Sequence, residues 1–297
     1  MAPLDPLDPL DPLDPLDALA ARRRNVDVRG ARLAVFEYGR QPAAGVPTLL
    51  LVHGYPDDHR VFLPAIAELS TTHHVVAYDT RNAGASVIVG SPGDFGLATL
   101  VDDVFAVLEA VGASAVHLVG HDWGSIQGWA AVQDPRAAAL ISRYTSISGP
   151  DLRHFSRWVR SRYRSPRAWR QLAGQLLRSW YIGAFLLPVL PEAAWRLFLT
   201  RRYAQVAKRD VGDDPVRGLA LYRSNMFAAR RWPAAARVAM PVQVVVPSRD
   251  PFLSPDLVDG LETWVDHLTV VPVDAGHWWP ATRPAEFAAL LRNAGAG

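Results

Sequence analysis

A single stretch of the chain, residues 115–132, limits its possible folds more than any other. Its first five residues are mostly apolar and predict a buried strand, and residues 125–132 predict a helix with small residues on its inner side. The pentapeptide GHDWG lies between them, with Asp122 at its centre. A tight strand-to-helix turn of the form Gly-x-nucleophile-x-Gly holds its central residue in a strained backbone conformation at the end of the strand. The motif therefore predicts that Asp122 is a nucleophile at the edge of an α/β sheet.

Aspartate stands where serine is the usual nucleophile, and this determines the chemistry to expect. A carboxylate can displace a group at a saturated carbon and form an alkyl ester, which water must then hydrolyse. Asp122 therefore indicates epoxide or carbon–halogen substrates rather than those of an ordinary esterase. The alternative is that Asp122 only caps the helix that follows it, which is a common role for aspartate.

Composition narrows the function classes. The chain has 297 residues, which is enough for one large or two small domains, and its formal charge is +2. The absence of cysteine excludes disulfides, thiolate catalysis and cysteine–metal sites. No stretch reaches the roughly eighteen apolar residues of a membrane span, and no secretory signal is recognisable, so we expect a cytoplasmic protein. We expect no nucleic-acid partner.

The sequence also offers no recognisable metal site. The adjacent His73 and His74 would face opposite sides of a strand, and no carboxylate–histidine cluster has metal-ligand spacing, so we expect no metal.

The amino-terminal arm, residues 1–24, is dominated by five copies of Pro-Leu-Asp between residues 3 and 17. Proline at every third position prevents a helix or a sheet ladder and favours polyproline II or disorder. The leucines would line one edge of such a helix and could dock in a partner's groove. The interpretation we favour is a solvated tail that the fold does not need.

From residue 25 onward, strands alternate with helices. The expected strands are 26–28, 33–38, 48–52, 74–78, 115–119, 140–146, 242–246 and 268–273, and the expected helices are 60–69, 97–111, 125–132 and 284–291. This alternation predicts an α/β fold with a mostly parallel central sheet flanked by helices and a site at the carboxyl ends of the strands. We assign residues 25–150 and 238–297 to this core.

The alternation stops over residues 151–237, where the period is helical and no strand is expected. This segment predicts an inserted helical cap over the strand ends. Seven arginines fall between Arg153 and Arg170. They could attract an anionic surface, although a solvated helix face is the interpretation we favour.

Two further stretches end at expected strand termini and supply partners for the nucleophile. Asp250, in VPSRDP, is placed to orient a histidine, and Asp274 is a competing acid. His277, in DAGHWW, supplies a base that can activate water near neutral pH. The chain order of nucleophile, acid and histidine is that of the α/β-hydrolases.

Two backbone amides could stabilise the oxyanion that forms when water attacks the ester. One is that of Tyr55, in VHGYP after the strand 48–52, and the other is that of Trp123. A Gly-x-Pro triplet alone is a weak signal because most such triplets are simple turns.

Taken together, the motifs HGYPDD, YDTRNAGAS, GHDWGS, PSRDPF and DAGHWW resemble those of the epoxide hydrolase group of α/β-hydrolases, from Val26 to the end of the chain. The resemblance implies a cofactor-independent enzyme that adds water to a small apolar epoxide to give a vicinal diol. It further implies that two cap tyrosines donate to the departing oxygen; SWY and LYRSNM carry the matching Tyr181 and Tyr222. It leaves a homodimer open.

Two alternatives remain. Haloalkane dehalogenases share the Asp-Trp turn, and a ligand-binding protein could keep the fold without turnover. The sequence also departs from the family pattern at Asn82, where glycine is usual. The region after the strand ending at Ser146 lacks the glutamate that some dehalogenases use as the acid, which favours Asp250.

Overall fold

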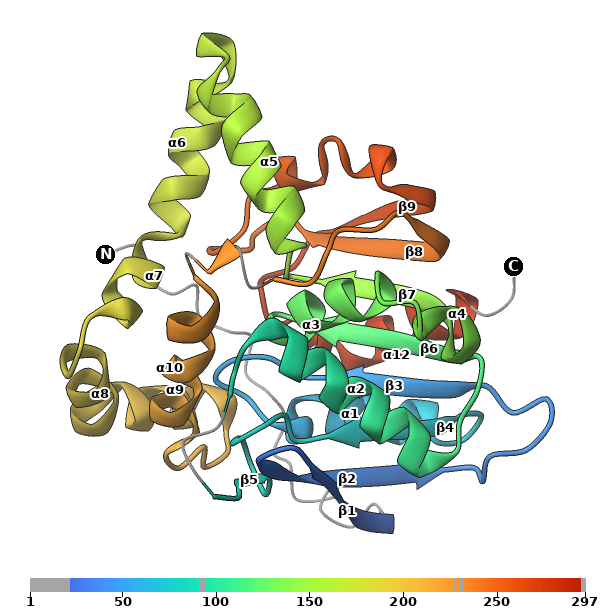
Figure 1. The fold of residues 1–297 in the computed structure, drawn as a ribbon. Helices are drawn as coiled ribbons and strands as arrows, with labels where there is room; N and C mark the ends of the chain where they lie inside the picture. Colours follow the sequence, from blue (N-terminus) through green and yellow to red (C-terminus); the bar gives the residue numbers. More distant parts are fainter. Residues whose placement is uncertain (1–21, 91–93, 227, 230–231, 295–297) are drawn as a thin grey trace.

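The computed structural model describes residues 22–90, 94–226, 228–229 and 232–294. It contains one central sheet in the order β1-β2-β4-β3-β6-β7-β8-β9, with β5 (Val87–Ile88) pairing to β2 (Figure 1). The members are β1 (Arg22–Val28), β2 (Ala31–Gly39), β3 (Thr48–Val52), β4 (His74–Tyr78), β6 (Val116–His121), β7 (Ile141–Ile147), β8 (Val238–Pro247) and β9 (Val265–Val273). Strand β2 pairs antiparallel with β1 and β4, and the pairs from β4 to β9 are parallel. The prediction of a mostly parallel α/β sheet is confirmed.

Several sequence-based boundaries differ from the structure, and two of the differences have a clear physical reason. Strand β1 already begins at Arg22, because Arg24 forms a 2.5 Å ion pair with Glu37 of β2 and extends the antiparallel ladder. Residues 22–24 are thus part of the sheet rather than of the arm, whose Pro-Leu-Asp repeat lies outside the described residues. The expected helix 60–69 consists of a 3₁₀ turn, η1 (His59–Phe62), followed by α1 (Leu63–Leu69). Pro64 has no N–H to donate and fits only the first turn of a helix, so the α-helix begins there.

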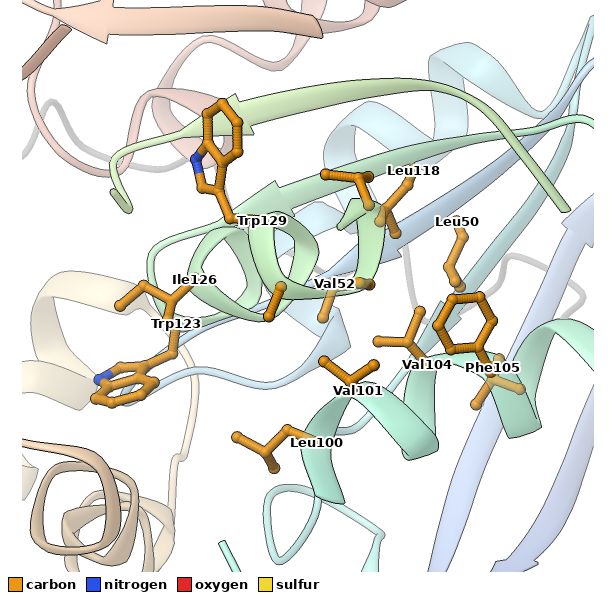
Figure 2. Packing of buried hydrophobic residues seen from close by; sticks show 14 of the residues in the cluster. Leu50, Val52, Leu100, Val101, Val104, Phe105, Leu118, Trp123, Ile126 and Trp129 are labelled. Carbon is orange, nitrogen blue, oxygen red and sulfur yellow. The ribbon is translucent and has the colours of Figure 1, made fainter. Parts of the chain in front are cut away.

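Two hydrophobic layers sandwich the sheet. Helices α2 (Leu97–Val111) and α3 (Trp123–Val132) pack on one face, where side chains such as Leu100 and Phe105 meet Leu50 and Leu118 of the central strands (Figure 2). Helices α1, α11 (Trp279–Thr282) and α12 (Pro284–Ala294) cover the other face. Every residue of β3 and β6 is buried, as expected for parallel strands covered on both faces. The core therefore holds the carboxyl ends of β3 and β6 side by side.

Six α-helices among the described residues lie between β7 and β8 in the sequence and stand beside the carboxyl ends of the parallel strands (Figure 1). We call them the cap helices: α5 (Leu152–Tyr163), α6 (Trp169–Arg178), α7 (Trp180–Leu186), α8 (Leu190–Ala194), α9 (Thr200–Ala207) and α10 (Asp214–Asn225). No described residue of this segment forms a strand. Within the described residues, no single helix is long and apolar enough to cross a bilayer; residues 180–186 and 190–207 meet that criterion only together, with a bend of 103° between them.

Helix α10 is fastened to the core at both ends. Asn225 accepts a hydrogen bond from the Leu97 amide (2.8 Å) and donates one to the Phe95 carbonyl (2.8 Å). At the other end, Asp214 accepts from the Gly84 amide (2.8 Å). Between residues 180 and 200, by contrast, the described side-chain hydrogen bonds to the rest of the protein come from Arg223 of α10. The position of α7 and α8 therefore depends on α10.

Candidate active site

Asp122 lies at the sharp turn between β6 and α3, with φ 53° and ψ −121°. This conformation is rare for a residue with a side chain, and the close approach of the two elements requires the flanking glycines. A Cβ on Gly124 would lie 2.0 Å from the Val52 carbonyl oxygen, and a Cβ on Gly120 would lie 2.5 Å from the Gly124 carbonyl oxygen. The Asp122 side chain makes no capping hydrogen bond to α3. The interpretation of Asp122 as a simple helix cap is therefore wrong.

One carboxylate oxygen of Asp122 is held by the backbone. The Tyr55 amide donates to Asp122 Oδ1 at 2.6 Å. The Trp123 amide borders the same space, because a Cβ on Gly54 would lie 2.5 Å from it and 2.2 Å from Asp122 Oδ1. Gly54 therefore has to lack a side chain for the two amides to surround one oxygen. The Tyr55–Pro56 peptide is cis.

The other carboxylate oxygen of Asp122 faces a buried histidine. His277 Nε2 lies 3.6 Å from Asp122 Oδ2, and His277 Nδ1 lies 2.9 Å from Asp250 Oδ2. The second oxygen of Asp250 accepts hydrogen bonds from the Phe252 amide (2.8 Å) and the Leu253 amide (3.2 Å), which fix its orientation. The structure thus brings Asp122, Asp250 and His277, which follow β6, β8 and β9, into one line with the imidazole between the two carboxylates.

Asp274, the competing acid, is not part of this arrangement. Its side chain is 80% exposed and contacts Arg249 and Ser248 at the surface. Although it is close to His277 in sequence, it follows β9 on the solvent side. The acid beside the imidazole is Asp250.

The charges of the two aspartates control the titration of the imidazole. Burial lowers the pKa of His277, but the carboxylates of Asp250 and Asp122 more than compensate and raise it to about 10. Burial also opposes ionisation of Asp250, and the positive charge of His277 together with the hydrogen bonds to its carboxylate brings the pKa of Asp250 below its ordinary value. With Asp122 ionised, His277 is therefore a cation at neutral pH.

The two cap tyrosines lie beside this line of residues. The Tyr222 ring is 5.1 Å from the Trp123 ring and 6.0 Å from the Tyr181 ring, measured between centroids. Burial raises the pKa of both phenols well above its usual range, and the negative charge of Asp122 adds to the effect. No hydrogen bond of ordinary geometry ties either hydroxyl to another described residue, whereas the Tyr55 hydroxyl donates to the Pro215 carbonyl (2.8 Å). Tyr181 and Tyr222 are thus protonated phenols that can donate to a ligand.

Two aromatic residues beside the site were given no role by the sequence analysis. Phe252 lies between Tyr181 and His277, with centroid distances of 5.2 and 4.9 Å. Phe185 packs against both Tyr181 (5.4 Å) and Tyr222 (5.0 Å). The sequence signals for them were the motif PSRDPF, which ends at Phe252, and the position of Phe185 four residues after Tyr181 on one helical face.

Asp57 is a further buried residue that the sequence analysis did not identify. It accepts hydrogen bonds from the Tyr203 hydroxyl (2.6 Å) and Trp278 Nε1 (3.0 Å), and it forms an ion pair with the buried Arg209. This network joins α9 of the cap to the loop after β3 and to the residue following His277. Its members are distant in sequence, so spacing could not reveal it.

The structure contains a carboxylate–histidine cluster, although the sequence indicated none with metal-ligand spacing. The potential ligand atoms of Asp58, His59 and Asp79 lie within 4.8 Å of one another. Each carboxylate already has protein donors: Asp79 Oδ1 accepts from the amide (2.9 Å) and Nδ1 (2.7 Å) of His59, and Asp58 pairs with Arg60 (2.6 Å). The cluster therefore orders the loop at the amino end of η1. Asn82, which stands where the family pattern has glycine, has a φ of 65°. Asparagine tolerates this left-handed conformation better than most residues that have a side chain.

A separate cavity borders Asp250 but neither His277 nor Asp122. Its lining includes Ser148, His154 and Leu257. Ser148 Oγ and His154 Nδ1 are buried without a hydrogen-bond partner among the described residues. Polar atoms of this kind suit ordered water, and the cavity is not where a substrate of Asp122 would bind.

Comparison with known proteins identifies related chains. A family model described as "alpha/beta hydrolase fold" matches residues 47–284. "Probable oxidoreductase EphD" of Mycobacterium tuberculosis is 31% identical over 286 residues, covering 89% of this chain and 48% of the relative. "Epoxide hydrolase 3" of Xenopus tropicalis is 24% identical, covering 83% of this chain and 71% of the relative. The chain thus spans about half the length of EphD.

Solved structures show the same fold. A structure of an epoxide hydrolase from Bacillus megaterium has a TM-score of 0.72 at 22% identity, covering 91% of this chain and 99% of that one. A structure of potato epoxide hydrolase has a TM-score of 0.71 at 19% identity, covering 92% and 98%.

Proposed function

This chain belongs to the α/β-hydrolase fold family, and we propose that it is an epoxide hydrolase that adds water to an oxirane through an alkyl ester on Asp122. The observation that carries the proposal is the meeting of two protonated phenols with a carboxylate nucleophile. Tyr181 and Tyr222 lie beside the line formed by Asp122, His277 and Asp250. A departing alkoxide needs a proton, and buried phenols provide it at neutral pH. Relatives named as epoxide hydrolases support the same substrate class.

In the first step, Asp122 Oδ2 attacks a ring carbon of the epoxide. A new C–O ester bond forms, the ring C–O bond breaks, and its electron pair moves to the ring oxygen. Tyr181 and Tyr222 hydrogen-bond that oxygen, and a phenol donates the proton that neutralises it. Oδ2 is the attacking atom because Oδ1 is held by the Tyr55 amide.

In the second step, water attacks the carbonyl carbon of the ester. Once Asp122 is esterified it carries no charge, so one of the two carboxylates that raise the pKa of His277 is gone. The imidazole can then lose its proton to the phenolate left by the first step and act as a base toward the attacking water through Nε2, while Asp250 holds Nδ1. The negative charge that develops on Oδ1 is received by the amides of Tyr55 and Trp123. As the intermediate collapses, the bond between its central carbon and Oδ2 breaks, and Oδ2 leaves in the diol with the remaining proton of the water, which restores the Asp122 carboxylate beside a protonated His277. Losing one such donor typically costs about 3 kcal/mol of transition-state stabilisation.

The test is a single turnover with styrene oxide in ¹⁸O-labelled water, followed by mass analysis of the peptide that contains Asp122. Label in the carboxylate together with diol formation is the expected result. In a variant with both Tyr181→Phe and Tyr222→Phe, diol formation should be nearly abolished. Full activity of that double variant would refute the role of the phenols. Absence of label and diol, with halide released from a bromoalkane, would establish a dehalogenase instead; absence of all three would leave a binding protein.

A further inference from the structure

The outer side of the cap exposes an apolar stripe. On α6 and the start of α7, the side chains of Trp169, Leu176, Leu177 and Trp180 are exposed, and their spacing places them on one helical face. Leu172, on the flank of this stripe, is buried against Trp158 and Leu257. Helix α6 thus has apolar side chains both inward and outward, and a helix that is apolar toward solvent lacks a partner there.

The exposed apolar residues continue along the cap. Leu187, Val189 and Leu190 follow α7, and Leu197 and Phe198 lie between α8 and α9. Val189 is 71% exposed and Leu197 73%. Helices α6, α7 and α8 form one outer side of the molecule, away from the sheet (Figure 1). Exposed apolar side chains therefore occur in each of the segments on this side of the cap.

The same part of the chain is strongly basic. Residues 152–207 contain eleven arginines, no lysine and one acidic residue, Glu192, which is paired with Arg223. Some of these arginines have structural partners; Arg162, for example, pairs with Asp259. Six others are exposed and have no carboxylate within 4 Å in the described part of the chain: Arg164, Arg167, Arg170, Arg196, Arg201 and Arg202. The solvated helix face favoured by the sequence does not explain why they flank exposed leucines and tryptophans.

We propose that this outer side of the cap docks on the surface of an anionic lipid bilayer. Aliphatic and tryptophan side chains would enter the boundary between headgroups and acyl chains, and the arginines would bind the lipid headgroups. A second copy of the chain fits less well, because a two-fold contact would place two strongly basic surfaces opposite each other. Nucleic acid would match the charge but not the exposed leucines and valines.

The docking surface shares a helix with the candidate active site. Trp180 points to solvent, whereas its neighbour Tyr181 and the next turn's Phe185 pack against Tyr222. Docking would therefore place α7 between the bilayer and Asp122. If the chain has the proposed function, docking in this orientation identifies its substrates as epoxides of lipid-soluble molecules that are supplied from the membrane.

The first test is flotation of the full chain with vesicles, in the absence of any substrate. Vesicles of phosphatidylcholine mixed with phosphatidylglycerol should bind the protein, and vesicles of phosphatidylcholine alone should bind it at least about tenfold more weakly. The variant with Leu177→Asp and Leu197→Asp should lose binding by more than about tenfold, since both side chains are over 70% exposed and neither supports the fold. Val89→Asp with Val270→Asp adds the same charge at exposed apolar positions outside the cap and should bind normally.

A second variant tests how much the arginines contribute to vesicle binding. Arg167→Gln with Arg170→Gln should weaken binding to the anionic vesicles about 25-fold, from about fivefold per arginine, and salt at about 0.5 M should weaken binding of the unaltered chain. No binding to anionic vesicles would overturn the proposal. So would a stable dimer that Leu177→Asp dissociates, because it would show that a second copy covers this surface.

The substrate class is tested separately from the chemistry. The Leu177→Asp, Leu197→Asp variant should hydrolyse dissolved styrene oxide at the normal rate but a long-chain epoxide embedded in anionic vesicles at least about tenfold more slowly. Equal rates on the embedded substrate would overturn the link between docking and substrate. Failure of the unaltered chain on styrene oxide, with vesicle binding intact, would count against the proposed function alone.

Discussion

Replacing Asp250 by asparagine should separate the two steps of the proposed reaction. The pKa of His277 rises from an ordinary value of about 6.5 to about 10, which corresponds to a net interaction on the order of 5 kcal/mol. Asp250 is the stronger of the two charges that produce this increase, so we assign it at least half, on the order of 2 to 3 kcal/mol. That share alone slows a step that creates an imidazolium about 70-fold. Asp250 also holds the His277 imidazole in the correct tautomer, and loss of that tautomer should slow ester hydrolysis further, toward about 10⁴-fold in total.

The assay is rapid quenching of a single turnover, with the ester on Asp122 followed by mass analysis. In Asp250→Asn the ester should form and then persist at least about 70-fold longer than in the unaltered chain. The hydrolysis rate should rise with pH as the imidazole loses its proton. Since the variant lacks the Asp250 charge, the pKa of His277 falls and this rise should move to lower pH.

Asp274→Asn is the matched control. Asp274 lies three residues before His277, but its side chain is 80% exposed and does not contact the imidazole. Its replacement should leave the ester lifetime unchanged. An ester in Asp250→Asn that decays at the normal rate, or an equal delay in Asp274→Asn, would refute the assignment of the acid.

Three further changes test the remaining parts. Tyr222→Phe should reduce diol formation by about 10²-fold or more through loss of a proton donor, without trapping the ester, as measured by steady-state turnover and mass analysis. Gly54→Ala should reduce turnover by at least about 10²-fold in a folded protein, verified by circular dichroism, because its Cβ would lie 2.2 Å from Asp122 Oδ1; normal activity would contradict the geometry. Arg81→Met should cost about 3–5 kcal/mol in urea unfolding near neutral pH by leaving the buried Asp103 unpaired. Burial raises the pKa of Asp103 to about 6 even with Arg81 present, so the loss should shrink as acid protonates Asp103.

Local patterns predicted the framework of the protein well. Apolar runs located β3, β4 and β6, and the GHDWG turn located the strained residue, because strand burial and backbone geometry leave direct marks on neighbouring residues. The sequence favoured Asp250 over Asp274 as the acid, but the side-chain directions that put Asp250 on the imidazole and Asp274 in solvent were beyond it. The meeting of Asp57 with Arg209 was also beyond the sequence, since it depends on how the cap packs on the core.

The fastening of α10 has a consequence for changing the substrate range of this protein by directed evolution. Tyr222 lies on the helix that Asn225 and Asp214 tie to the core, so substitutions there disturb the proton donor and the fold together. Helices α7 and α8 make their described side-chain hydrogen bonds to α10 through Arg223. Libraries directed at α7 and α8, with Arg223 and Tyr181 kept, should therefore change the side chains around the tyrosine pair at little cost in yield of folded protein.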